Sequence, residues 1–248
     1  MVEPMFVRSF DSIPMPGQLI ELSGTEAKHA ISVRRMRVGE SIQLTDGSGL
    51  RVRGQVKTLA GNSMAVQIDS VASEKAPDIR ITLVQALAKG DRDELAIQAA
   101  TELGIIGVIP WEADRSVSRW IGLKEAKGVE RWQSIVTEAA KQSMRSWHPK
   151  VQQPARSSQF ADLFGTFDQV LVLDPTAPAG LAATSFNSAG SVALVVGPEG
   201  GISESELLAF QQAGAIRVNL GEPILRTSTA GIAAISAILA LTGQWGSK

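Results

Sequence analysis

The chain has 248 residues, of which 44% are hydrophobic and 20% are charged, and its formal net charge is -1. This composition predicts a globular protein of one or two domains, and it excludes both a disordered chain and a uniformly basic nucleic-acid coat. Because the chain has no cysteine and only two histidines, disulfide frameworks, cysteine nucleophiles and three-histidine metal sites are excluded, and we expect no metal.

The first ten residues lack the apolar core of a signal peptide. The longest apolar stretch, residues 231–241, is too short to cross a bilayer. We therefore expect a soluble cytoplasmic protein that makes no membrane contact.

Residues 1–73 are predicted to form a small β-barrel-like domain. Apolar and polar residues alternate in four short segments, which is typical of half-buried strands: 17–22, 40–45, 51–56 and 63–69. The pair Asp46-Gly47 is a hairpin signal, and a short helix is expected near residues 25–32. A polar stretch with a proline, residues 73–78, is predicted to be a linker.

Residues 78–248 are predicted to form an α/β domain with a mainly parallel sheet, because strand and helix patterns alternate along this part of the chain. The expected strands are 79–86, 105–110, 169–173, 191–196 and 216–220. The expected helices are 91–103, 123–144, 203–213 and 228–241. The last helix is apolar on nearly every face, so we expect other protein surface to cover it.

Positive charge is concentrated between Lys28 and Lys57, a segment that contains seven basic residues and only two acidic ones, Glu40 and Asp46. Such an excess in one small domain favours a surface that binds a polyanion such as RNA. A solvated face of the barrel is the alternative.

A glycine-rich turn, residues 197–201, follows the strand predicted at 191–196. Ser203 and Glu206 have the spacing of a capping box that begins the next helix. In open α/β sheets ligands bind beyond the carboxyl ends of the strands, so this turn is a candidate binding loop, with an ordinary strand–turn–helix connection as the alternative. The turn matches neither a phosphate-binding loop nor a dinucleotide fingerprint, which argues against a kinase or a nucleotide-dependent oxidoreductase.

A second loop, residues 219–230, also lies between a predicted strand and a predicted helix. Thr227 or Ser228 is expected to cap that helix. Arg226 stands beside the positive end of the helix dipole, where a cation does not stabilise the helix. We therefore expect Arg226 to meet a carboxylate or a nucleobase oxygen, and an exposed ion pair is the alternative.

These two loops resemble those of the SPOUT methyltransferases, whose α/β domain contains a trefoil knot, and most closely those of the bacterial RsmE family. The similar residues are Gly197-Pro-Glu-Gly-Gly, Leu220-Gly and Ile224-Leu-Arg-Thr-x-Thr-Ala. Further similarities extend over nearly the whole chain, at 29–39, 89–92, 97–104, 115–116 and 138–145. Nothing in the periodicity of the chain indicates a knot, so that expectation comes from the resemblance alone.

The resemblance implies an enzyme that uses S-adenosyl-L-methionine (SAM) to methylate N3 of a uridine in 16S ribosomal RNA. It further implies a PUA-like RNA-binding barrel over 1–73, a knotted methyltransferase domain over 78–248, a homodimer, and the 30S subunit or its RNA as the partner. The chain departs from the family at Ala99, where a lysine is frequent, and at Ser228, where a glutamate is frequent. An RNA-binding protein with a degenerate catalytic domain is therefore the alternative.

Uridine N3 carries a proton, so its methylation needs a base or a cation that stabilises the developing anion. Arg226 fits the role of the cation, and Glu199 is expected to act as a base or to orient Arg226. The residues expected to bind the cofactor are Leu173, Val196, Gly197, Pro198, Gly200, Gly201, Leu220, Gly221, Ile224, Leu225 and Thr229.

The residues expected to contact RNA are His29, Arg34, Arg35, Arg37, Lys89 and Arg115. A structural role in the barrel is the alternative for His29. The tryptophans at 111, 120, 132 and 147 are expected in the core or a dimer contact rather than stacked on bases.

Overall fold

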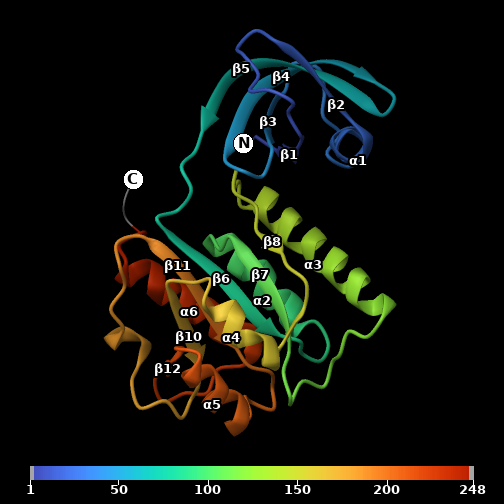
Figure 1. Cartoon of the computed structure of the whole chain (residues 1–248). Helices are drawn as coiled ribbons and strands as arrows, with labels where there is room; N and C mark the ends of the chain where they lie inside the picture. The colour runs from blue at the N-terminus through green and yellow to red at the C-terminus, as the bar shows by residue number, and fades with distance from the viewer. Residues whose placement is uncertain (1–2, 246–248) are drawn as a thin grey trace. The chain divides into compact units, whose positions relative to one another are not determined.

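The computed structural model describes residues 3–245, which fall into two compact units (Figure 1). The first unit consists of Met1–Ala76 and Ala140–His148, and the second consists of Pro77–Ala139 and Pro149–Lys248. The first break in the chain lies within the polar stretch predicted as a linker. The segment 140–148 departs from the sequence expectation, which placed it in the second domain.

The first unit contains a five-stranded sheet in the order β1-β3-β4-β5-β2. The strands are β1 (Met5–Val7), β2 (Leu19–Ser23), β3 (Ser41–Thr45), β4 (Leu50–Ala60) and β5 (Ser63–Ser73). The pairings are antiparallel except that of β1 with β3, which is parallel. The alternating pattern places Ile42, Val52, Val56 and Val66 in the core, as the sequence predicts.

The helix expected at 25–32 is an α-helix, α1 (Gly24–Lys28), that continues as a π-helical turn (His29–Val33). An exposed loop follows. Within this loop the Met36 side chain is buried, and Arg35 has a positive φ of 54°.

The segment 140–148 belongs to the first unit because it contacts α1, β4 and the turn before β4 there. Lys141 Nζ lies 2.9 Å from the Glu26 carboxylate, and the Arg51 guanidinium donates to the Met144 carbonyl at 2.8 Å. Gly49 is required at its position, because a Cβ atom there would lie 2.7 Å from the Trp147 ring. These contacts join residues about a hundred positions apart, so no local sequence pattern indicates them.

The second unit is built on a parallel sheet in the order β12-β10-β11-β6-β7-β8, with β9 also paired to β7. The strands are β6 (Ile79–Ala86), β7 (Gly107–Glu112), β8 (Lys150–Val151), β9 (Ala155–Arg156), β10 (Gln169–Leu173), β11 (Gly190–Val196) and β12 (Ile216–Val218). The five longer strands match the predicted ones within a few residues, whereas the two-residue strands β8 and β9 were not predicted.

Helices cover both faces of this sheet (Figure 1). They are α2 (Arg92–Leu103), α3 (Leu123–Gln142), α4 (Phe160–Phe164), α5 (Glu204–Gln212) and α6 (Thr227–Leu241). Successive residues of β6 point to opposite faces, so Leu83 packs in the α2–α6 core while Val84 packs in the core of α4 and α5.

Three of the tryptophans expected to be structural, Trp111, Trp120 and Trp132, pack within this unit. Trp111 and Trp132 are fully buried, and Trp120 packs edge-on against Trp132.

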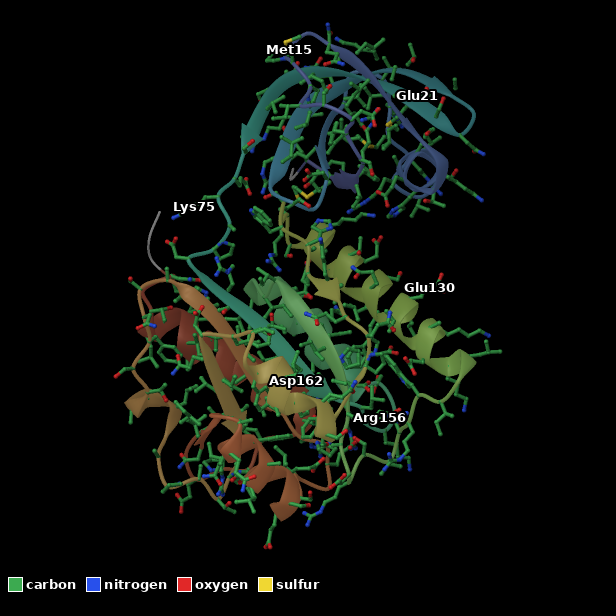
Figure 2. All side chains as sticks on the ribbon, in the orientation of Figure 1. Met15, Glu21, Lys75, Glu130, Arg156 and Asp162 are labelled. Atoms are coloured by element: carbon green, nitrogen blue, oxygen red, sulfur yellow. The ribbon has the colours of Figure 1, made fainter. Side chains whose placement is uncertain are left out.

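On the outer side of α3, Glu130 is exposed to solvent (Figure 2). No helix within residues 3–245 has the length and apolar character that a membrane span requires.

Candidate active site

A cavity of about 660 Å³ lies in the second unit, where the carboxyl ends of three parallel strands meet. Leu173 ends β10, Val196 ends β11 and Val218 ends β12, and all three residues line the cavity. The volume lies within the usual range for sites that bind small molecules and cofactors. The sequence argument that ligands bind at this edge of the sheet therefore leads to a real cavity.

Most residues expected to bind the cofactor come together in the wall of this cavity: Leu173, Val196, Gly197, Pro198, Gly201, Leu220, Gly221, Ile224 and Leu225. Gly200 and Thr229 are not part of the wall. A Cβ atom on Gly200 would point at Arg115, 3.1 Å from its Cβ, and the Thr229 hydroxyl donates to the Arg226 carbonyl at 3.2 Å. Their assignment to the cofactor-binding set stays a prediction that the cavity wall does not support.

The first glycine-rich turn is tightly packed. A Cβ atom on Gly197 would lie 2.7 Å from Ile202 Cγ1, and Gly201 has a φ of +72°, so both positions favour glycine. The predicted capping box is confirmed, since Ser203 Oγ accepts from the Glu206 amide and Glu206 Oε2 accepts from the Ser203 amide. The capping box therefore fixes the residue at which α5 begins, and Gly197, Pro198 and Gly201 of the turn line the cavity.

The second loop ends at Arg226, which is itself the N-cap residue of α6. The prediction that Thr227 or Ser228 caps this helix is wrong, because α6 already begins at Thr227 and no side chain caps it. Before the helix, Gly221 turns with a φ of +95° and its amide donates to Asn219 Oδ1 at 3.0 Å.

The Arg226 side chain is exposed and lines the cavity. Throughout the part of the chain that the structure describes, no carboxylate and no carbonyl pairs with its guanidinium. The alternative of an exposed ion pair is therefore not observed. A permanently charged fork without a protein partner, beside a helix amino terminus, is well placed for an electron-rich ligand atom.

Glu199 also lines the cavity, but it is paired with Arg92 and not with Arg226. Its Oε1 atom accepts from Arg92 Nη1 at 2.8 Å and from the Lys89 amide at 3.1 Å. Partial burial raises the pKa of Glu199, but the amides of Glu199 and Lys89 and the Arg92 guanidinium together outweigh it and hold the pKa below its ordinary value. The expectation that Glu199 orients Arg226 is wrong, and a carboxylate with a lowered pKa is a weak base.

Arg92 and Asp174 are site residues that the sequence reasoning missed. Asp174 follows β10, lines the cavity and is only 7% exposed. Burial raises its pKa, but hydrogen bonds from Thr176 and Arg217 outweigh this and hold the pKa below its ordinary value. An acidic residue directly after a buried strand is the signal that identifies it.

Two of the residues expected to contact RNA lie in this unit. Arg115 lines the cavity, and its Nη1 atom donates to the Gly200 carbonyl at 3.2 Å. The Lys89 side chain is exposed, while its amide donates to Glu199. Arg92, Arg115 and Arg226 line the cavity together with three acidic residues, Asp174, Glu199 and Glu204, so its wall carries charges of both signs.

The other expected RNA contacts lie in the first unit, around the loop after α1. Arg34, Arg35 and Arg37 are exposed. His29 is half-buried and packs edge-on against Phe6, which favours its structural role. Elsewhere in the basic segment, Arg51 pairs with Glu74 and Arg53 lies 3.7 Å from Glu3, so these two cations are partly neutralised within the unit.

No cluster of three or more histidine, aspartate or glutamate side chains suited to a metal ion occurs within residues 3–245.

Comparison with known proteins identifies both parts of the chain. Residues 74–239 match the model of an RNA methyltransferase domain, and residues 22–69 match that of an RNA methyltransferase PUA domain. The ribosomal RNA small subunit methyltransferase E of Mycobacterium bovis is 38% identical over 241 residues, which cover 95% of this chain and 91% of the relative. The protein of the same name from Bacillus subtilis is 31% identical, over 88% of each chain.

Solved structures agree with this result. A ribosomal RNA small subunit methyltransferase E from Neisseria gonorrhoeae, bound to SAM, has a TM-score of 0.85 and 29% identity, with 97% of this chain and 98% of that chain covered. A methyltransferase from Legionella pneumophila, in complex with SAM, has a TM-score of 0.86, 29% identity and the same coverage. The resemblance seen in the two loops is confirmed, and the chain belongs to the RNA methyltransferase family of the ribosomal RNA small subunit methyltransferases E.

Proposed function

We propose that the chain uses SAM to methylate N3 of a uridine in 16S ribosomal RNA. The observation that carries the proposal is the cavity in which both glycine turns meet the unpaired guanidinium of Arg226. Similar structures from Neisseria gonorrhoeae and Legionella pneumophila are solved with SAM, and this chain has a cavity of suitable size lined by its two loops.

The residues of the wall suit this cofactor. Apolar side chains offer a slot for the adenine ring: Leu173, Val196, Leu220, Ile224 and Leu225. The glycine turns at 197 and 221 present backbone amides and carbonyls to the polar groups of a bent ligand. When bound, SAM supplies a methyl group activated by the adjacent positively charged sulfur.

The residues of the chain then have to bind the uridine and stabilise its anion. Loss of the N3 proton places negative charge on uridine O2 and O4. Arg226 stabilises this charge through its planar, permanently protonated fork. Alignment of the two reactants in one cavity supplies a further part of the rate, because it removes the entropy cost of bringing them together.

The proposal extends to the whole chain. Residues 1–73 form a PUA-like barrel that binds RNA, residues 78–248 carry a trefoil knot and the chemistry, and the working form is a homodimer in the cytoplasm that acts on small-subunit RNA. The family departures Ala99 and Ser228 both lie outside the cavity wall.

The test is mass spectrometry of 16S ribosomal RNA nucleosides from cells with and without the gene. We expect 3-methyluridine to disappear from one position when the gene is deleted, and to return when the wild-type gene is restored. An unchanged content of 3-methyluridine would overturn the proposed specificity. Calorimetric titration with SAM tests the alternative, because an RNA-binding protein with a degenerate domain would give no binding heat.

A further inference from the structure

Gln85 is a fully buried polar residue in β6, a central strand of the parallel sheet. Its side-chain Nε2 donates to Thr227 Oγ1 at 2.8 Å and to the Ala86 carbonyl at 3.1 Å. Its Oε1 atom is buried and has no hydrogen-bond partner within residues 3–245. A core position occupied by an amide that is only partly satisfied indicates a role other than packing.

The two bonds fix which way the amide faces. The Ala86 carbonyl can only accept a hydrogen bond, so the nitrogen of Gln85 must be the atom on that side. The same nitrogen meets Thr227, whose oxygen therefore accepts. The hydroxyl hydrogen of Thr227 then remains to be donated, and the structure shows no acceptor for it in the described part of the chain.

Thr227 lies in the wall of the cavity although it is only 6% exposed. It is the first residue of α6 and follows Arg226 directly. An uncommitted donor at a helix amino terminus attracts an oxygen that carries negative charge.

We propose that the Thr227 hydroxyl donates to such an oxygen of the bound reactants, and that Gln85 is the positioning residue that holds the hydroxyl in this direction. This inference rests on the proposed function. Two oxygens have the required chemistry, the carboxylate of SAM and the carbonyl oxygen of the uridine as it becomes anionic. They differ in the measurement that they affect.

The test compares Thr227→Val, Thr227→Ser and Gln85→Met with the wild-type protein. SAM affinity is measured by calorimetry, and single-turnover methylation of 16S RNA is measured at saturating SAM and RNA. Thr227→Val keeps the shape but removes the donor. We expect a loss of roughly 10- to 100-fold in methylation rate with unchanged SAM affinity if the acceptor is the uridine, and a loss of similar size in SAM affinity if the acceptor is the SAM carboxylate.

Four further results are expected. Thr227→Ser restores most of the loss, because it restores the hydroxyl. Gln85→Met reproduces the loss, and the double variant is no worse than either single one, because both changes remove the same interaction. The control Thr242→Val removes a threonine hydroxyl at the other end of α6, where it bonds to the Ile238 carbonyl, and it leaves both measurements unchanged.

The inference is overturned if Thr227→Val lowers only the melting temperature and changes neither measurement, or if the serine does not rescue. If the wild-type protein binds SAM and methylates RNA, and Thr227→Val gives the same SAM affinity and methylation rate, only this inference is refuted. A wild-type protein that binds no SAM and methylates no RNA refutes the proposed function and this inference with it.

Discussion

At the scale of single residues, the site is organised by which charges are already paired. Glu199 is satisfied by Arg92, and Asp174 is satisfied by Arg217, whereas the guanidinium of Arg226 has no partner in the described structure. A paired charge is largely neutralised and fixed, while an unpaired one at the cavity wall is available for a ligand. The same residue types therefore serve different purposes in one small site.

Arg226 is predicted to act in the transition state more than in binding. Arg226→Ala should lower the single-turnover methylation rate by about 10²–10³, because one donor to a developing anion is lost. Arg226→Lys should recover only part of this rate, since it keeps the charge without the fork. A wild-type rate for Arg226→Ala at saturating SAM and RNA would make Arg226 a binding or folding residue.

Glu199 is predicted not to be the general base. Because its pKa lies below the ordinary value, it is ionised throughout the neutral range and titrates only in acid. The pair with Arg92 should thus be present at neutral pH and be lost as the pH falls through the lowered pKa. Glu199→Gln should keep the shape of the pH–rate profile above about pH 6, although the rate itself falls as Arg92 is released. Loss of an inflection from the profile of this variant would restore Glu199 as the base.

At the scale of elements, α6 links the packing of the sheet to the site. Its amino terminus carries Arg226 and Thr227, and Gly231 one turn later is where it approaches β6 and β11 closely. A Cβ atom on Gly231 would lie 3.3 Å from both Leu83 and Val196. The position of Arg226 therefore depends on a glycine that does not line the cavity.

We expect Gly231→Val to push α6 away from the sheet. Overpacking of this kind costs about 1–3 kcal/mol of the free energy of unfolding, measurable by urea denaturation. The methylation rate should fall as well, because Arg226 moves with the helix. Ala240→Val places the same side chain at an exposed position of α6 and should change neither quantity appreciably. Equal effects of the two substitutions would show that valine acts through helix propensity alone.

At the scale of the whole molecule, we predict that the chain separates RNA affinity from chemistry. The exposed arginines 34, 35 and 37 lie in the first unit, and the cavity lies in the second. Replacing all three with alanine should weaken RNA binding and reduce its salt dependence, because fewer counterions are released. SAM affinity should remain that of the wild-type protein. Unaltered RNA affinity in a filter-binding salt series would reduce this loop to a solvated surface.

The second whole-molecule prediction is the homodimer. The structure changes its rationale, because most of the apolar surface of α6 is already covered within its own unit. Exposed apolar side chains are found instead around residues 117–123, where Val117, Ile121 and Leu123 are each more than 70% exposed. Such a patch favours a protein partner. Light scattering at micromolar concentration should give twice the chain mass, and an active monomer would refute the dimer.

The sequence by itself determined the two-part organisation and the main strands and helices, and it predicted a ligand-binding edge of the sheet at which the structure has a cavity. These follow from local periodicity, from glycine turns and from the rule that parallel strands end at one edge of the sheet. The strands and helices that were missed are short: β1, β8, β9 and α4 span two to five residues, too few for a periodic pattern to develop.

Only the tertiary structure decided which side chains meet. The pairing of Glu199 with Arg92 joins residues 107 positions apart, and the bond from Gln85 to Thr227 joins residues 142 positions apart. The inclusion of 140–148 in the first unit likewise depends on contacts such as that of Lys141 with Glu26. Local pattern specifies backbone conformation and burial, whereas long-range pairs depend on how distant segments are brought together, and for that reason they became visible only in the folded chain.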